Sequence, residues 1–374
     1  MFGLSYGYEH PLWYAPAGME PVESYGFERQ NCFQPVAGEC RALRESVGII
    51  DVSNFAKYRI RGAGSADYLD RLVANRVPTE TGRSCLTPMI GLRGGIAGDF
   101  TITKLDDDDF LMIGSGIAER YHQRYFDMVA RADSVSFDSF TEAWGGFNVA
   151  GPNARKLLER LTDADLSNDA FGFMRSRRIP VAGIDAVAIR VSFSGDLGWE
   201  IYVPLEHQLA LYDALLGEGA AFGARPVGGR ALLSLRVEKG YGSWSREYSP
   251  EYWPQEVGLD RLIKLEKPEF LGRDAYLGIK DNPPREKLVV VRVEQSESDA
   301  NGGEPVFLTD GTPVGRVSSG AYGHSVGASI ALCFIRTAHA GAGTELDVAI
   351  LGMPHRAVIL EHPPFDARGE RLRA

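Results

Sequence analysis

Two carboxylates stand directly after glycine-rich turns, and their surroundings suit them to proton handling and ligand binding. Asp99 ends the run from Arg93 to Asp99, which contains three glycines, and Glu200 follows Gly198 and Trp199. The absent side chains leave room for a planar ligand against the backbone. A β-like stretch continues beyond each carboxylate. Because a strand end holds its side chain in one direction, each carboxylate can be aimed at a reacting or recognised group.

The two side chains suit different tasks. An Asp beside a ligand can receive or orient the proton of an aromatic amine while that nitrogen attacks an electrophilic carbon, and Asp99 is the candidate for this role. Glu200 can accept two hydrogen bonds from a fork of N–H groups, because both oxygens of a carboxylate accept. The plainer alternatives are that Asp99 stabilises a hairpin turn and that Glu200 lies in solvent at a strand edge.

Aromatic residues gather in two segments, one near the N-terminus and one after residue 240. They are Tyr6, Tyr8, Trp13 and Tyr14 in the first group and Tyr241, Trp244, Tyr248, Tyr252 and Trp253 in the second. Aromatic faces attract the diffuse positive charge of a methylated ammonium or sulfonium group. The second group is therefore a candidate box for such a donor, with Tyr241, Trp244 and Tyr248 as its expected members. The alternative is that these side chains are hydrophobic plugs.

Composition limits the class of protein. The chain has 374 residues, 44% of them hydrophobic and 24% charged, which fits a globular protein of two or three domains. Its formal net charge of −10 argues against a nucleic-acid surface, because phosphate contacts need clustered Lys and Arg. No stretch approaches the roughly 18 uninterrupted apolar residues of a membrane span, and no secretory signal is visible. We therefore expect no nucleic-acid or membrane partner.

Residues that commonly bind metals or nucleotides are scattered. The four cysteines, at positions 32, 40, 85 and 333, form no C-x-x-C pair and have no His partner at zinc spacing. We expect no metal site and, from the unpaired thiols, a cytoplasmic location. The dinucleotide-like fragment 114–116 has Glu119 where a third glycine is required. The sequence therefore predicts no flavin or nicotinamide site in this chain.

Hydrophobic spacing predicts an α+β protein with an all-β C-terminal module. The predicted helices are 37–47, 206–216 and 229–238. Adjacent prolines in 280–286 predict a linker, because they exclude helix. Short alternating segments then predict a small antiparallel β-barrel or sandwich, with strands at 288–293, 313–318, 345–351 and 357–360. The acidic run 106–109 is expected to be a hairpin tip.

The first part of the chain contains a weak internal echo. Residues 60–62 and 149–151 each predict a strand end and a glycine turn that leads into an amphipathic helix. Two interpretations stay open. Either a common strand–helix unit occurs twice, or the region is an internal duplication in which Asp99 and Glu200 each follow one copy.

The carboxylate motifs resemble those of the folate-binding aminomethyltransferase family, which includes the glycine-cleavage T-protein. Asp99 matches the family's Gly-Gly-x-x-x-Asp element and Glu200 its Gly-aromatic-Glu element. The runs 239–244 and 267–273 add to the resemblance, which is closest to the folate-binding half of dimethylglycine and sarcosine dehydrogenases. The resemblance implies that Asp99 is catalytic and that Glu200 recognises the pterin of tetrahydrofolate.

Two further positions are cofactor-binding candidates although they depart from the family pattern. Phe193 stands where the family often has Tyr, a change that keeps stacking on a pterin but loses a hydroxyl hydrogen bond. The family's Arg four residues before Arg236 is Leu232 here, and Arg230 lies two residues earlier, as in the dimethylglycine dehydrogenase branch. Two residues turn a helical side chain by about 200°, so Arg230 cannot simply take over the contact.

The resemblance implies three domains around a central folate channel, with a folate-binding region of two interleaved α+β domains at 1–279 and a β-barrel domain at 287–374. The implied function is tetrahydrofolate-dependent one-carbon transfer or demethylation, by a stand-alone enzyme acting on a small methylated amine, betaine or sulfonium compound. The flavin half of the dehydrogenases is expected to be missing. Either a separate flavoprotein supplies an iminium or formaldehyde, or a methyl group moves directly from a cationic donor to the folate N5.

A non-catalytic class competes with this one. Folate-binding assembly factors for iron–sulfur proteins share the fold and carry a Lys-Gly-Cys-Tyr element. The corresponding run here, 239–242, contains no cysteine. A folate-binding assembly or regulatory protein is therefore the alternative hypothesis.

Overall fold

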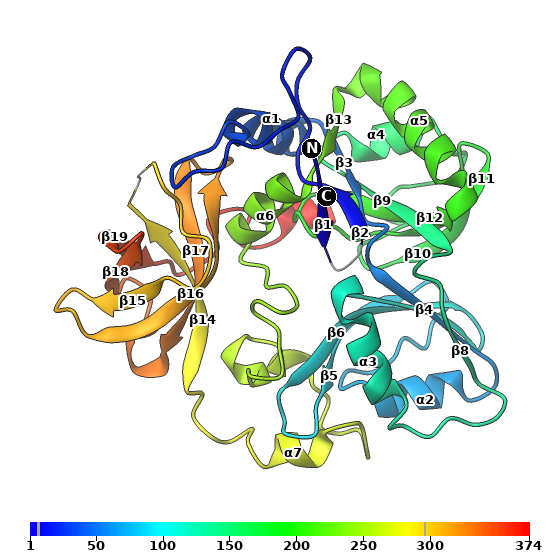
Figure 1. Ribbon diagram of the computed structural model, residues 1–374. Helices are drawn as coiled ribbons and strands as arrows, with labels where there is room; N and C mark the ends of the chain where they lie inside the picture. The colour runs from blue at the N-terminus through cyan, green and yellow to red at the C-terminus, as the bar shows by residue number, and fades with distance from the viewer. Residues whose placement is uncertain (6–7, 295–296) are drawn as a thin grey trace.

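The computed structural model describes residues 1–5, 8–294 and 297–374 and consists of two β-sheet units and a β-barrel (Figure 1). Tyr6, from the N-terminal aromatic group, lies outside the described residues. The first sheet contains, in spatial order, β5 (Ser84–Ile90), β6 (Ile96–Asp106), β7 (Asp109–Gly114), β4 (Ala56–Arg61) and β8 (Ser136–Ser139). The second contains β10 (Ser176–Val181), β11 (Ile184–Ile189), β12 (Gly198–Pro204), β9 (Trp144–Ala150), β3 (Val47–Asp51) and β13 (Ala224–Val227).

The barrel is closed by six strands, so the expected C-terminal antiparallel barrel is confirmed. Its spatial order is β14 (Glu286–Val293), β17 (Ala328–Arg336), β16 (Pro313–Gly323), β15 (Pro305–Leu308), β18 (Glu345–Ile350) and β19 (Met353–Ile359). The helices are α1 (Phe33–Glu45), α2 (Ser65–Leu72), α3 (Glu119–Phe126), α4 (Ala154–Leu158), α5 (Gln208–Gly219), α6 (Gly229–Glu238), α7 (Arg273–Leu277) and α8 (Glu370–Arg373). An N-terminal pair, β1 (Phe2–Ser5) and β2 (Tyr8–Pro11), is antiparallel.

The two sheets repeat one topology. Along the chain, β4-α2-β5-β6-β7 and β9-α4-β10-β11-β12 have the same order of elements, and the spatial orders β5-β6-β7-β4 and β10-β11-β12-β9 also correspond. A single strand–helix unit would account for only the first two elements of each copy, so the topology favours the internal duplication. The two carboxylates are not equivalent in it, since Asp99 lies on β6 and Glu200 on β12, the counterpart of β7.

The predicted helices are present, with α6 at its predicted bounds. α1 begins earlier than expected, at Phe33, because Pro35 lies in the first turn, where the missing N–H is not needed. The barrel strands β15 and β17 were not predicted. β17 shows no alternation because it is buried on both faces, with Ala331 and Cys333 in the barrel core and Ile330 and Leu332 against α6.

Neither membrane spans nor clustered metal ligands are found in the part of the chain that the structure describes. None of its helices has the length and apolar composition that crossing a bilayer requires. The described residues also contain no group of three or more His, Cys, Asp or Glu side chains placed to hold a metal ion.

We expect the repeated glycines Gly62 and Gly151 to be essential for stability. Both have positive φ, and a Cβ would lie 1.9 Å from Ser134 O at Gly62 and 2.5 Å from a backbone oxygen at Gly151. Either Gly→Ala change should therefore cost more than about 3 kcal/mol of unfolding free energy, since strain and collision add. Gly183→Ala, at a positive φ with open space, is the control and should cost about 1 kcal/mol. Equal losses in denaturant titrations would contradict the collision argument.

Candidate functional site

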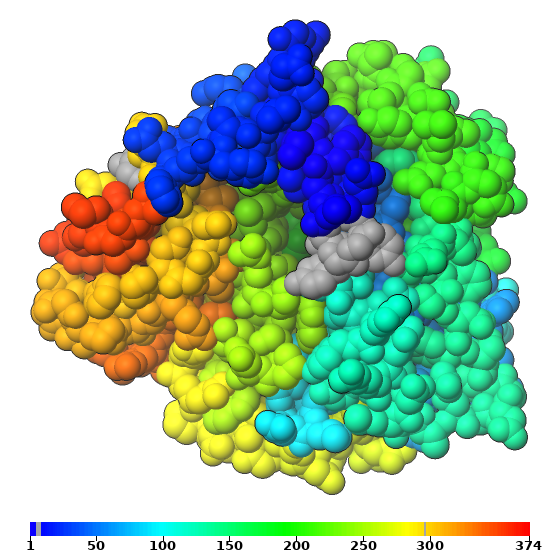
Figure 2. Space-filling model, viewed as in Figure 1, coloured from blue at the N-terminus to red at the C-terminus, as the bar shows by residue number. Residues whose placement is uncertain are grey.

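A cavity of about 470 Å³ brings together six of the seven predicted site residues. Those that line it are Asp99, Phe193, Glu200, Tyr241, Trp244 and Tyr248. They come from β6, from the β11–β12 loop, from β12 and from the segment after α6. In the space-filling view this last segment, in yellow-green, fills the space between the barrel and the first sheet (Figure 2).

Asp99 offers the cavity a carboxylate oxygen that the protein itself does not use. Asp99 and Thr101 alternate with the core residues Phe100 and Ile102 along β6, and both face the cavity. The buried Oδ1 of Asp99 has no hydrogen-bond partner among the described residues. Burial raises the pKa of Asp99 to about 6. Because buried acceptors are rarely left unpaired, Oδ1 is free to accept a proton or a hydrogen bond from a ligand.

The glycines before Asp99 are required by protein packing, not by approach of a ligand. A Cβ at Gly95 would lie 2.2 Å from the carbonyl oxygen of Pro250, and one at Gly98 would lie 2.7 Å from the ring of Phe100. The turn at Gly95 therefore packs against the segment after α6, which carries the aromatic residues. The ring of Phe100 covers β6 at Gly98. The room that the sequence suggested for a planar ligand is taken by the protein.

Glu200 is buried in a central strand of the second sheet. Trp199 and Ile201 point into the core beneath α4 and α5, whereas Glu200 and Tyr202 point to the opposite face. The hydroxyl of Tyr202 donates to Oε2 of Glu200 at 2.7 Å. Burial raises the pKa of Glu200 to about 7, although the Tyr202 hydrogen bond and the charge of Lys57 lower it. The alternative of a solvent-exposed edge residue is wrong.

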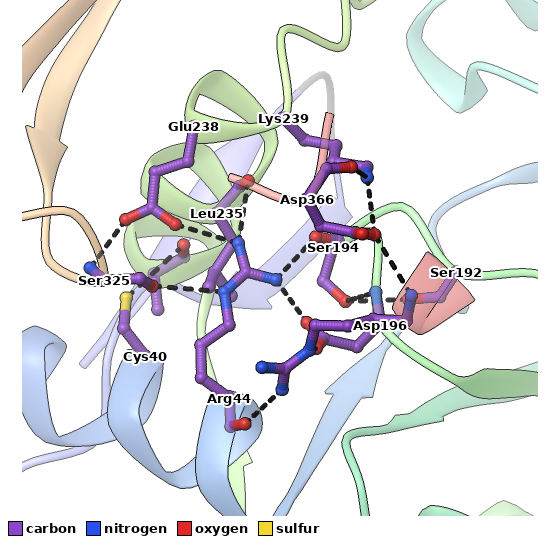
Figure 3. Close-up of polar contacts among 12 residues, drawn as sticks. Cys40, Arg44, Ser192, Ser194, Asp196, Leu235, Glu238, Lys239, Ser325 and Asp366 are labelled. Atoms are coloured by element: carbon purple, nitrogen blue, oxygen red, sulfur yellow. Dashed lines mark hydrogen bonds and ion pairs between the residues drawn. The ribbon is translucent and has the colours of Figure 1, made fainter. Parts of the chain in front are cut away.

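Phe193 lies in a loop that a buried ionic network holds in place (Figure 3). Its ring is nearly parallel to that of Tyr241, with centroids 6.0 Å apart. Arg44 donates to the carbonyl oxygen of Ser194 at 2.8 Å and forms an ion pair with Asp196 of the same loop. Arg44 could not be identified from the sequence, because it lies about 150 residues from its loop partners.

The aromatic residues of the second group divide between the cavity and the barrel. Trp244 packs edge-on against His122 of α3 with centroids 5.0 Å apart. Burial, together with the charge of nearby Asp99, raises the pKa of the Tyr248 hydroxyl. Tyr252 instead stacks on Phe334 of the barrel with centroids 3.9 Å apart, and Trp253 lies against Arg285. Trp13 is buried in the core, and neither Trp13 nor Tyr14 is among the residues that line the cavity.

Arg230 is not brought to the cavity. Its guanidinium pairs with both carboxylate oxygens of Glu23, with Nη2 to Oε2 at 2.6 Å. Glu23 is buried, so this ion pair anchors the N-terminal segment on the start of α6. Arg230, which was expected to contact the ligand, therefore lies apart from the six predicted site residues that line the cavity.

A second cavity of about 380 Å³ adjoins the first and shares Arg261 and Arg373 with it. Lys239 and Arg368 also line it, and no carboxylate is among its described lining residues. Lys239 pairs with Asp366 at 2.9 Å, whereas Arg261 and Arg373 donate to backbone oxygens. The guanidinium groups of Arg261 and Arg373 therefore give the region where the two cavities adjoin a positive charge. The arginine-rich stretch 368–373 was a sequence signal for Arg373 but not for Arg261.

Both parts of the chain match models of one family. Residues 1–267 match the one described as the GCVT N-terminal domain, and residues 286–366 match the glycine cleavage T-protein C-terminal barrel domain. The chain is 30% identical over 357 residues to the aminomethyltransferase of Listeria welshimeri and covers 96% of that protein. The crystal structure of the glycine cleavage system aminomethyltransferase T from Bartonella henselae has a TM-score of 0.84, covers 98% of this chain and 94% of its own, and at 22% identity shows the same fold.

Longer relatives contain a similar region. The chain is 33% identical over 364 residues to human mitochondrial dimethylglycine dehydrogenase, covering 96% of this chain. It is 32% identical over 379 residues to the 4-methylaminobutanoate oxidase (formaldehyde-forming) of Paenarthrobacter nicotinovorans. The chain spans 42% and 45% of the length of these two proteins. The matches at both ends and over the full length of a relative show that the chain belongs to the aminomethyltransferase family of glycine cleavage T-proteins.

Proposed function

We propose that the protein transfers a one-carbon group from a small methylated, cationic donor to tetrahydrofolate. The observation that carries this proposal is the single cavity that contains an unpaired Asp99 oxygen, the buried Glu200 and the aromatic residues Tyr241, Trp244 and Tyr248. The family membership supports folate as the acceptor. The aromatic wall supports a methylated amine, betaine or sulfonium compound as the donor.

The chemistry of the cavity fits tetrahydrofolate. Glu200 can accept from the N–H edge of a pterin, and the rings of Phe193 and Tyr241 supply apolar faces for it. Arg261 and Arg373 replace Arg230 as the proposed partners of the anionic glutamyl end, because both line the second cavity and neither is paired with a carboxylate of the described residues. Tetrahydrofolate would supply the nucleophilic nitrogen that accepts the carbon.

Asp99 is the proposed proton acceptor. A pKa of about 6 leaves its carboxylate mostly ionised at neutral pH but close enough to the working pH for proton transfer. As the new carbon–nitrogen bond forms, Asp99 would take the proton released from nitrogen. Tyr248 lines the same cavity, and burial together with the charge of Asp99 raises its pKa, so its hydroxyl remains protonated. The aromatic wall would hold the positive end of the donor and keep water from the reacting carbon.

The source of the carbon decides the route. A methylated amine must first be oxidised to an iminium or formaldehyde, and we propose that a separate flavoprotein does this for the present chain. A sulfonium or quaternary ammonium compound already has a cationic leaving group and would transfer its methyl group directly.

All four cysteines are free thiols, which supports the proposed cytoplasmic location.

The product of the reaction tests the proposal. The protein would be incubated with tetrahydrofolate and either a betaine or sulfonium donor alone or dimethylglycine plus a flavin-dependent dehydrogenase. Formation of 5-methyltetrahydrofolate in the first assay, or of enzyme-dependent 5,10-methylenetetrahydrofolate in the second, supports one route. Folate binding without transfer in either assay would favour a non-catalytic assembly or regulatory protein.

We expect Asp99→Asn to lower turnover by about 10²-fold or more while leaving folding and folate affinity nearly unchanged, because the amide keeps the shape but cannot accept the proton. Wild-type turnover should rise with pH through about 6, as Asp99 ionises. Steady-state rates between pH 5 and 8 would check both points. A folded Asp99→Asn protein that keeps its turnover would make Asp99 structural.

Glu200→Gln should affect binding and stability in opposite directions. Loss of the carboxylate should weaken folate binding by roughly 1–3 kcal/mol. The folded pKa of about 7 exceeds the ordinary value of 4.5, so wild type loses stability as pH rises between these values and the Gln variant does not. Above pH 7 the free energy of unfolding of the variant, compared with that of wild type, should therefore be higher by up to about 3 kcal/mol than the same comparison gives at low pH. Calorimetry and denaturant titrations would show this, and a pH-independent difference in stability would refute it.

Trp244→Leu should raise the KM of the donor roughly 5- to 10-fold with little change in folate affinity, because it removes one aromatic face from the cavity. Trp253→Leu is the matched control, since Trp253 lies outside the cavity against Arg285. An unchanged donor KM in the Trp244 variant, or a neutral aryl methyl ether as the best donor, would show that the aromatic wall does not bind a cation.

A further inference from the structure

A β-bulge in the barrel directs two consecutive serines to one carboxylate. The register of β16 against β17 shifts between Val317 and Ser319, so Ser318 is an extra residue in the ladder. Neighbouring side chains of a regular strand point to opposite faces. Here the hydroxyls of Ser318 and Ser319 both donate to Oε1 of Glu247, at 2.7 and 2.6 Å. The bulge makes this convergence possible.

Glu247 lies on the barrel side of the segment whose aromatic residues face the cavity. Its Oε2 accepts from the backbone N–H of Ser243 at 2.9 Å and from Arg236 of α6 at 3.3 Å. Arg236 also donates to the carbonyl oxygen of Tyr241 at 2.8 Å. Glu247 therefore joins the start of this segment to both α6 and the barrel, and its neighbour Tyr248 lines the cavity.

This carboxylate depends on its donors because it is fully buried. A buried charge is tolerated only when it is paired and hydrogen-bonded. The two serine hydroxyls are the donors that the barrel supplies. No described residue of the barrel strands lines the cavity, so any effect of the barrel on a ligand has to pass through contacts such as these.

We propose that Glu247, Ser318 and Ser319 are positioning residues through which the barrel sets the shape of the aromatic wall and thereby the affinity for the donor. The inference rests on the proposed function, because it takes Trp244 and Tyr248 as the donor site. Glu200 on β12 and Phe193 in the β11–β12 loop are two of the proposed pterin contacts, and among the hydrogen bonds of the described residues none joins them to Ser318, Ser319 or Glu247. Donor and folate affinities should therefore respond differently to changes at the bulge.

The test compares the double variant Ser318→Ala/Ser319→Ala with wild type by calorimetry. The probes are tetramethylammonium for the aromatic wall and 5-formyltetrahydrofolate for the pterin site. We expect tetramethylammonium to bind about tenfold more weakly and the folate within twofold of wild type. Ser318→Thr/Ser319→Ala, which restores one hydroxyl, should recover most of the loss. Ser329→Ala is the control, because Ser329 is a buried barrel serine that donates to Asp299 at 2.7 Å, away from this segment.

Unchanged tetramethylammonium affinity in the double variant would overturn the inference, as would equal weakening of both probes or an equal effect of Ser329→Ala. Failure of the proposed function gives a different result. If wild type binds the folate but not tetramethylammonium, the donor class is wrong. In that case hydrogen exchange at the backbone amide of Ser243, which donates to Glu247, tests the positioning role. Faster exchange in the double variant supports this role, and unchanged exchange overturns it.

Discussion

One buried cation, the guanidinium of Arg44, joins the loop beside the second sheet to helix α6 and the barrel. It extends from α1 and contacts Asp196 in the β11–β12 loop, Glu238 at the end of α6 and Ser325 in the barrel (Figure 3). Arg371, from the C-terminal helix α8, pairs with the same Asp196 at 2.8 Å. Removing one member of such a buried network leaves the charges of the others without a partner. The resulting loss of stability is larger than the net contribution of the intact ion pair. The loop with Phe193 and the residues of α8 that line the cavity are thus fixed by one set of charges.

The same principle of charge burial has the opposite effect inside the cavity. Asp99 and Glu200 are surrounded by protein and form no ion pair with any residue that the structure describes, and burial raises both pKa values. These groups make the unliganded protein less stable at neutral pH than it would be with neutral side chains. A ligand that supplies N–H donors relieves this cost. The charges of the Arg44 network are therefore satisfied within the protein, whereas those of Asp99 and Glu200 are left for the proposed ligand.

Local sequence patterns were sufficient for much of the fold and for most of the site. The Asp99 and Glu200 motifs are contiguous, so their glycines and strands could be read without knowledge of distant contacts. Arg230 could not be placed, because its partner Glu23 lies 207 positions away. The same applies to Arg44 and to Glu247, whose partners come from other parts of the chain. Strand β17 was missed for a related reason: α6 covers its outer face and removes the polar alternation that usually marks a strand.

The composition of the cavity wall has a consequence for how the molecule folds. Its residues extend from Phe55 in the first sheet to Arg373 in α8. Each sheet and the barrel has its own hydrophobic cluster and can condense separately, but the cavity requires contacts between residues hundreds of positions apart. Such contacts form slowly, because long loops must close first. During synthesis the cavity is therefore completed late, after the two sheets, the barrel and α8 have come together.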